Sequence, residues 1–217
     1  MTTLAQWHEG GEYFSFKGHE IFYLTLGDNQ KPPLVLIHGF PTCSWDWAKI
    51  WQPISQKFQC ITLDMLGFGF SDKPQTPYSI YTQADIHCAL ITRLDCQSCH
   101  IVSHDYGDTV AQELLARHNQ GTLPFSINSL HLLNGGLFPE THRPLVIQRL
   151  LMSPLGGIVV KLLNKRSFTK NLRKIFAADS QLSAAEVDDY WQLLTHNKGR
   201  LAMHRLIHYM AERIENR

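Results

Sequence analysis

Asp105 lies in the segment SHDYGD (103–108), where an apolar run ends and a helix-like run begins. At such a turn its carboxylate would face the N-terminus of the following helix, whose dipole and free N–H groups favour the ionised form. An aspartate before a helix is commonly an N-cap. A carboxylate can also attack an electrophilic saturated carbon, which gives an ester that water cleaves. Attack on a carbonyl would give a high-energy anhydride, so the chemistry that we expect involves epoxides or alkyl halides.

Two further polar turns accompany this one, HGFP at 38–41 and DMLGFGFSDKP at 64–74. Each follows an apolar run, PPLVLIHG (32–39) in the first case and CITLDM (60–65) in the second, that is typical of a buried strand. Ligands of open α/β sheets bind outside the carboxyl ends of the strands. The three turns together therefore predict one site at one edge of a sheet.

Strands and helices alternate along the first part of the chain. We expect a hairpin over 12–27, strands at 32–39, 60–65, 100–105 and 126–136, and helices at 44–58, 79–95 and 106–118. This order predicts a mostly parallel sheet with helices on both faces. From about Pro139 onward the periodicity is helical, without a clear further strand. We therefore expect an α/β core over residues 1–138 and a helical cap over residues 139–217.

The composition excludes several classes of protein. Twenty Lys and Arg face nineteen Asp and Glu, a formal net charge of +1, which gives no basic footprint for nucleic acid. No apolar stretch approaches the roughly 20 residues of a membrane span, and the N-terminus does not resemble a signal peptide. Five cysteines, an odd number, favour reduced thiols in the cytoplasm. Cys96 and Cys99 have metal-site spacing but lack a second pair, so we expect neither metal nor cofactor; the oligomeric state stays open.

Together the three turns resemble the α/β-hydrolase superfamily over essentially the first 138 residues. SHDYG matches that family's small–x–nucleophile–x–small elbow with Asp105 in the nucleophile position, whereas Ser103 falls at a packing position and no GxSxG occurs. HGFP is similar to the family's oxyanion loop. The resemblance implies that the backbone N–H groups of Phe40 and Tyr106 stabilise an oxyanion, and that His38 orients the loop without reacting. GFGFSDKP is a family marker to which we assign no catalytic role.

Two positions favour the epoxide-hydrolase branch of the superfamily. Dehalogenases usually carry Asn after His-Gly and Trp after the nucleophile, as donors to the halide; here these positions are Phe40 and Tyr106. Epoxide opening needs an acid for the departing alkoxide, and the resemblance implies a cap tyrosine: Tyr209, or as a weaker candidate Tyr190. We expect Phe40 and Tyr190 to contact a small-molecule substrate with an electrophilic carbon. A dehalogenase-like hydrolase and a non-catalytic binding protein remain alternatives, and either tyrosine could instead be an ordinary half-buried aromatic.

Longer segments resemble a narrower branch, which contains the mesoderm-specific transcript proteins and their bacterial homologues. They are SHDYGDTVAQELLAR (103–117), LNGGLFPETHRPL (133–145) and the helix around Tyr209. The superfamily places an acid and then a histidine on strands that follow the cap. None of the twelve histidines stands at the matching position. We therefore expect a chain truncated relative to the family, with its last strands missing, in which any ester on Asp105 accumulates.

Overall fold

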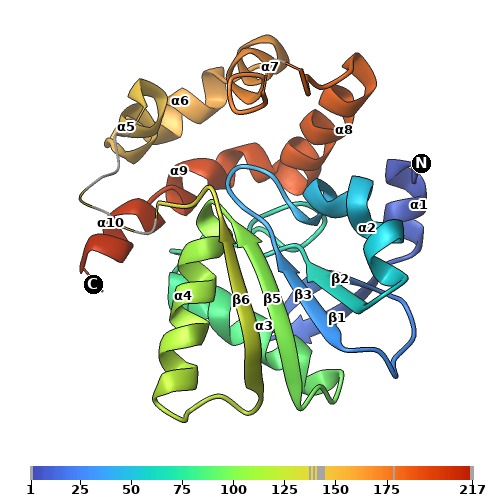
Figure 1. The fold of residues 1–217 in the computed structure, drawn as a ribbon. Helices are drawn as coiled ribbons and strands as arrows, with labels where there is room; N and C mark the ends of the chain where they lie inside the picture. Colours follow the sequence, from blue (N-terminus) through green and yellow to red (C-terminus); the bar gives the residue numbers. More distant parts are fainter. Residues whose placement is uncertain (1, 137, 139, 141–144, 178, 216–217) are drawn as a thin grey trace.

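The computed structural model describes residues 2–136, 138, 140, 145–177 and 179–215, and its sheet has the predicted mostly parallel character (Figure 1). The strands are β1 (Glu12–Phe16), β2 (His19–Leu26), β3 (Pro33–Ile37), β4 (Gln59–Leu63), β5 (Ser98–His104) and β6 (Ser126–Leu133). They lie in the order β1-β2-β4-β3-β5-β6. β1 and β2 form the expected antiparallel hairpin, β2 is antiparallel to β4, and the remaining neighbours are parallel.

Helices cover both faces of the sheet. The helices of this part are α1 (Leu4–Glu9), the 3₁₀ helix η1 (Ser44–Trp47), α2 (Ala48–Ser55), α3 (Ile80–Arg93) and α4 (Tyr106–Asn119). α3 and α4 lie together on one face, and α1 and α2 lie on the other (Figure 1). β3 is buried along its last four residues because both of its faces are covered, which explains its uninterrupted apolar sequence. The helix predicted over 44–58 consists of two elements, η1 and α2, and Pro53 lies inside α2.

α1 is an element that the sequence did not predict. It begins with a capping box, in which the Thr3 hydroxyl accepts from the Gln6 N–H and the Gln6 side chain accepts from the Thr3 N–H. Trp7 is 1% exposed and packs edge-on against Trp45 and Trp51. A helix of six residues is unstable alone, so this tryptophan cluster holds it in place.

The C-terminal part is helical, as predicted, and lies over the carboxyl ends of the parallel strands (Figure 1). It consists of α5 (Val146–Met152), α6 (Gly156–Leu162), α7 (Lys165–Leu172), α8 (Ala184–Thr195), η3 (His196–Ala202), α9 (Met203–Leu206) and α10 (Tyr209–Glu215). The division of the chain at residue 138 stays a prediction. Residues 137, 139 and 141–144 of the LNGGLFPETHRPL segment lie outside the described residues. Within the described part of the chain, no helix is long and apolar enough to cross a membrane.

Candidate active site

Asp105 stands at the junction of β5 and α4 with φ 52° and ψ −116°. A positive φ is uncommon for residues other than glycine and costs of the order of 1–3 kcal/mol, which the surrounding structure must hold in place. Two glycines make the turn possible. A Cβ on Gly107 would lie 2.5 Å from the carbonyl oxygen of His38, and one on Gly39 would lie 2.6 Å from the Cβ of Asp105. The end of β3 and the β5–α4 turn therefore approach each other too closely for a side chain at either glycine.

The carboxylate of Asp105 is held by two backbone donors. The N–H of Phe40 donates to Oδ1 at 2.8 Å, and the N–H of Tyr106 donates to the same oxygen at 2.6 Å. Burial raises the pKa of Asp105, and the two hydrogen bonds and the charge of His104 oppose that rise. The favourable effect of the N–H groups on the ionised form was expected, but burial outweighs it.

This arrangement differs from that of an ordinary N-cap. Such a residue has an extended backbone, and its side chain bonds the N–H of the second or third helical residue. Asp105 precedes α4 directly, yet its carboxylate bonds the first helical N–H and a second N–H from the loop after β3. The structure thus joins the SHDYGD and HGFP turns at one oxygen atom.

Tyr209, on α10, lies against this junction. Its ring centroid is 4.1 Å from that of Tyr106 and 6.3 Å from that of Phe40. It is 4% exposed, and burial followed by the charge of Asp105 raises its pKa. Arg213, one helical turn further on, lies 5.9 Å from the Tyr209 ring and donates to the carbonyl oxygen of Gly136. The helix around Tyr209 is therefore anchored at the carboxyl end of β6.

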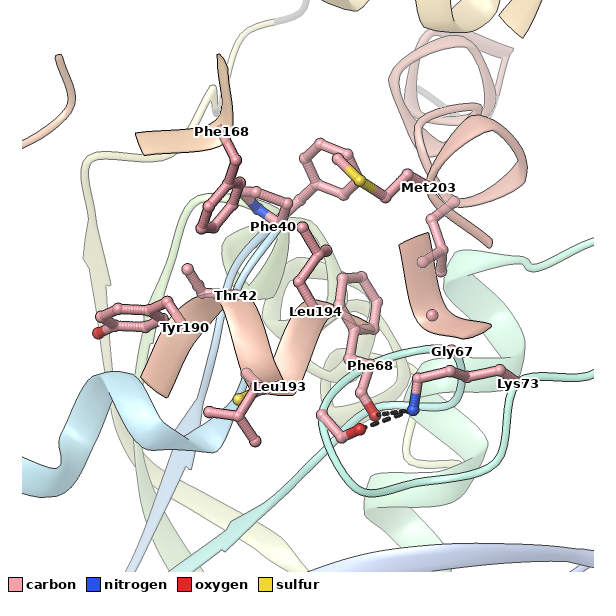
Figure 2. Close-up of a pocket in the computed structure, with 15 residues that line it drawn as sticks. Phe40, Thr42, Gly67, Phe68, Lys73, Phe168, Tyr190, Leu193, Leu194 and Met203 are labelled. Atoms are coloured by element: carbon pink, nitrogen blue, oxygen red, sulfur yellow. Dashed lines mark hydrogen bonds between the residues drawn. The ribbon is translucent and has the colours of Figure 1, made fainter. Parts of the chain in front are cut away.

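A cavity separates the loops of the sheet from the C-terminal helices (Figure 2). Phe40 and Phe68 line it from the loops, and Phe168, Leu194 and Met203 line it from α7, α8 and α9. Its volume is about 10 Å³, the space of about one water molecule. The walls are mostly apolar, and a ligand larger than water requires the helices to move.

Lys73 and Tyr190 also border this cavity. Lys73 donates to the carbonyl oxygens of Gly69 at 2.6 Å and Phe68 at 3.4 Å (Figure 2). It also donates to the carbonyl oxygen of Ser71 at 2.7 Å, and burial lowers its pKa to about 8. Tyr190, the other predicted cap tyrosine, lines the cavity from α8. Burial and the nearby carboxylate of Asp46 raise its pKa. Tyr190 thus lines the cavity, whereas Tyr209 packs against Phe40 and Tyr106, whose N–H groups bond Asp105.

A polar cluster beneath the HGFP turn was not predicted. His104 Nε2 lies 3.0 Å from Asp46 Oδ2, and the Thr42 hydroxyl donates to that same oxygen. Burial lowers the pKa of His104, but the contact with Asp46 and the charges of Asp105 and Asp108 outweigh it, so the pKa is raised. The ring of His104 therefore lies against Asp46 of η1.

Ser103 and Asp108 form a second buried pair on the other side of β5. The Ser103 hydroxyl donates to Asp108 Oδ1 at 2.5 Å, and both residues are at most 1% exposed. Among the described residues, Asp108 Oδ2 has no hydrogen-bond partner, and burial raises the pKa of the carboxyl. A Cβ on Gly135 would lie 1.9 Å from Oδ2, so glycine is required there. Ser103 is thus committed to packing, as predicted.

His38 holds the HGFP turn. Its Nδ1 donates to the carbonyl oxygen of Gly39 and its Nε2 accepts from the N–H of Met65, both at 3.0 Å. Burial lowers its pKa, which suits the neutral ring that these bonds require. In the neighbouring loop, Asp72 Oδ2 accepts from the N–H of Glu20. In the described residues no group of three His, Cys, Asp or Glu side chains could hold a metal ion.

Comparisons with known proteins identify the fold family. The family model for the alpha/beta hydrolase fold matches residues 32–185. The mesoderm-specific transcript homolog protein of Bos taurus is 45% identical over 97% of this chain, which spans 66% of that protein's length. The soluble epoxide hydrolase of a Corynebacterium species is 32% identical in sequence over the matched region. That region covers 43% of this chain and 32% of the epoxide hydrolase's length. A solved α/β-hydrolase fold protein from Burkholderia ambifaria has a TM-score of 0.77 at 25% identity, covering 94% of this chain and 73% of that one.

Proposed function

Because the chain belongs to the α/β-hydrolase fold family, as its three polar turns predicted, we propose that it is a hydrolase whose Asp105 forms an ester with epoxides. One observation carries the proposal. Asp105 has a positive φ, and its Oδ1 accepts from the N–H groups of Phe40 and Tyr106 on two different segments. An N-cap needs neither the strained backbone nor the second segment, whereas a fixed nucleophile uses both.

The proposed reaction uses the two oxygens of Asp105 differently. Oδ2 makes no hydrogen bond with the described residues, so it is the oxygen that attacks a carbon of the epoxide. The C–O bond of the three-membered ring breaks, and the Tyr209 hydroxyl gives its proton to the departing alkoxide. Its raised pKa keeps the phenol protonated until then. Oδ1 becomes the carbonyl oxygen of the ester and stays between the N–H groups of Phe40 and Tyr106, which would stabilise the oxyanion formed when water attacks.

The mostly apolar walls of the cavity favour an epoxide that carries an apolar substituent. Phe40, Phe68 and Phe168 line it, and Phe40 also supplies an N–H to Asp105. Tyr190 would contact the same substituent from α8. Since about 10 Å³ is too small for a substrate, entry requires the proposed cap, residues 139–217, to move away from the loops.

No histidine donates to or accepts from Asp105 among the described residues. Water activation in this family depends on a histidine base, so the ester should accumulate on this chain. Incubation with styrene oxide, followed by intact-mass spectrometry, should show one adduct of the whole epoxide, and peptide mapping should place it on Asp105. The Ser103→Ala variant should still form it, and Asp105→Asn should not. An adduct that survives in Asp105→Asn, or no adduct on the unaltered chain, would overturn the proposal.

Tyr209→Phe separates epoxide opening from dehalogenation. Loss of the phenol should slow ester formation from the epoxide by roughly 10²-fold or more, the usual contribution of a general acid. Ester formation from 1-bromobutane needs no proton and should be unchanged if the chain accepts that substrate at all. Tyr190→Phe is the matched control, with little change expected for either compound. Bromide release that exceeds epoxide opening would favour the dehalogenase alternative, and ligand binding without any adduct would favour a non-catalytic binding protein.

A further inference from the structure

Helices α5, α6 and α7 form the outermost layer of the molecule, on the side away from the sheet (Figure 1). We call their solvent side, residues 145–175, the outer face. On and beside α5 and α6 it carries six large apolar side chains that are 44–74% exposed: Leu145, Val146, Leu150, Leu155, Ile158 and Leu162. Single exposed apolar residues are ordinary, but several on adjoining helices mark a surface that binds something.

The same segment is strongly basic. Residues 145–177 contain no Asp or Glu and seven exposed cations: Arg149, Lys161, Lys165, Arg166, Lys170, Arg173 and Lys174. The whole chain has a formal charge of only +1, so positive charge is concentrated here. Asp188 on α8 pairs with Lys165, and Glu186 pairs with Lys49 of the core. The other cations of the outer face form no ion pair within the described part of the chain.

A hollow lies on α7. Lys165, Arg166, Thr169, Lys170 and Arg173 line it. Lys165 pairs with Asp188, but the other three cations of the hollow have no ion-pair partner among the described residues, and Arg and Lys bind phosphate oxygens well. α5 and α6, which carry the exposed apolar residues, belong to the same layer as α7 (Figure 1).

We propose that the outer face binds the surface of an anionic lipid bilayer. Phosphate groups of the lipid heads would occupy the α7 hollow, and the apolar side chains of α5 and α6 would enter the boundary between heads and acyl chains. Helices that combine exposed Lys and Arg with exposed aliphatic residues bind such interfaces without crossing them. Nucleic acid would use the cations but not the six apolar residues. A symmetric second copy would set the same cations against one another.

α7 relates this surface to the cavity. Phe168 is 4% exposed and lines the cavity, while Lys165, Arg166 and Lys170 of the same helix are exposed. A bilayer bound at the outer face therefore touches a helix that covers the cavity. The proposal does not depend on the reaction assigned to Asp105, because vesicle binding is measured without a substrate.

Co-sedimentation of the purified chain with vesicles tests the proposal. Vesicles of phosphatidylcholine with phosphatidylserine should bind it, vesicles of phosphatidylcholine alone should bind it far more weakly, and added salt should weaken the binding. A cation near an anionic surface contributes about fivefold to the partition coefficient, the equivalent of about 1 kcal/mol. Lys170→Gln with Lys174→Gln should therefore lower it about 25-fold, whereas Lys57→Gln on the core should not.

The apolar part has its own variant. Leu162→Ser should lower the partition coefficient by roughly tenfold or more, the value of burying one leucine, and Ile50→Ser on α2 should leave it unchanged. All these side chains are exposed, so unchanged melting curves should accompany each result. Equal binding to both kinds of vesicle, no binding, or equal loss with Lys57→Gln overturns the proposal. Self-association that Leu162→Ser abolishes, or duplex-DNA binding without vesicle binding, assigns the surface to another partner.

Discussion

Replacing Gly107 by alanine should destabilise the chain, although alanine is the better helix former. The new Cβ would lie 2.5 Å from the carbonyl oxygen of His38 and 2.6 Å from that of Ile37, where ordinary contacts begin at 3.4 Å. Both neighbours are backbone atoms at the end of β3, so neither can rotate away. Overpacking of this kind costs about 1–3 kcal/mol, and relief of the glycine penalty in a helix returns up to about 1 kcal/mol.

We therefore expect a net loss of about 1–2 kcal/mol for Gly107→Ala. For a chain of this length 1 kcal/mol corresponds to about 2–4 °C in the melting temperature, so the midpoint should fall by about 2–8 °C. Gly157→Ala on α6 is the matched control, because among the described residues outside its own helix the new Cβ would have one atom within 4 Å, Nε2 of His204 at 3.9 Å. That variant should be neutral or more stable, by up to about 1 kcal/mol.

Differential scanning calorimetry on the two variants and the unaltered chain provides the comparison. If the end of β3 contacts the β5–α4 turn in this way, the melting temperature should fall in Gly107→Ala. It should rise or stay unchanged in Gly157→Ala. Equal upward shifts would mean that helix propensity decides both positions. The close approach of the two turns, and with it the shared oxygen of Asp105, would then be wrong.

Three further predictions follow from neighbouring contacts. Gly135→Ala should destabilise more than Gly107→Ala, since its Cβ would lie 1.9 Å from Asp108 Oδ2; adding Asp108→Ala should recover part of the loss in urea unfolding, and no recovery would contradict the contact. Burial lowers the pKa of His104, but the contact with Asp46 outweighs it, so the pKa is raised above 6.5. The pair therefore stabilises the chain fully below pH 6.5, and this stabilisation is lost as the pH rises through the pKa of the folded chain. Asp46→Asn should cost stability below pH 6.5 and progressively less above it, and a cost that does not depend on pH would contradict this. Ser183→Ala removes the capping box of α8, in which Ser183 Oγ accepts from the Glu186 N–H, and should cost about 1 kcal/mol, whereas Ser180→Ala, outside the helix, should not.

The strands and the three turns were predictable because each is a local pattern. β3 and β4 are continuous apolar runs, and α3 begins at Ser79, whose side chain accepts from the N–H of Thr82. α1 was missed because its stability comes from Trp7 packing on residues some forty positions later, and not from its own six residues. The helix over 44–58 was only partly right because its first turn is a 3₁₀ helix.

The polar supports of the candidate site could not be read from spacing. Asp46 and His104 are far apart in sequence and meet only because β3 and β5 are neighbours. Asp64 is the first residue of the DMLGFGFSDKP turn, and nothing in that segment indicates that its carboxylate accepts from the N–H groups of Ser44 and Phe70. Asp108 belonged to the quoted SHDYGD segment, but its burial against Ser103 and Gly135 follows from how closely β6 approaches α4. These are tertiary facts, and no local pattern contains them.

The hydrogen bonds to Asp105 make its two oxygen atoms chemically distinct. Oδ1 is held by the N–H groups of Phe40 and Tyr106, and rotation of the carboxylate would break both bonds. In the proposed reaction the attacking oxygen leaves with the product alcohol, and an oxygen from water replaces it on the side chain. Heavy isotope from labelled water would therefore enter one position of Asp105 and spare the other, so even slow hydrolysis of the accumulated ester would leave each chain with one of its original carboxylate oxygens.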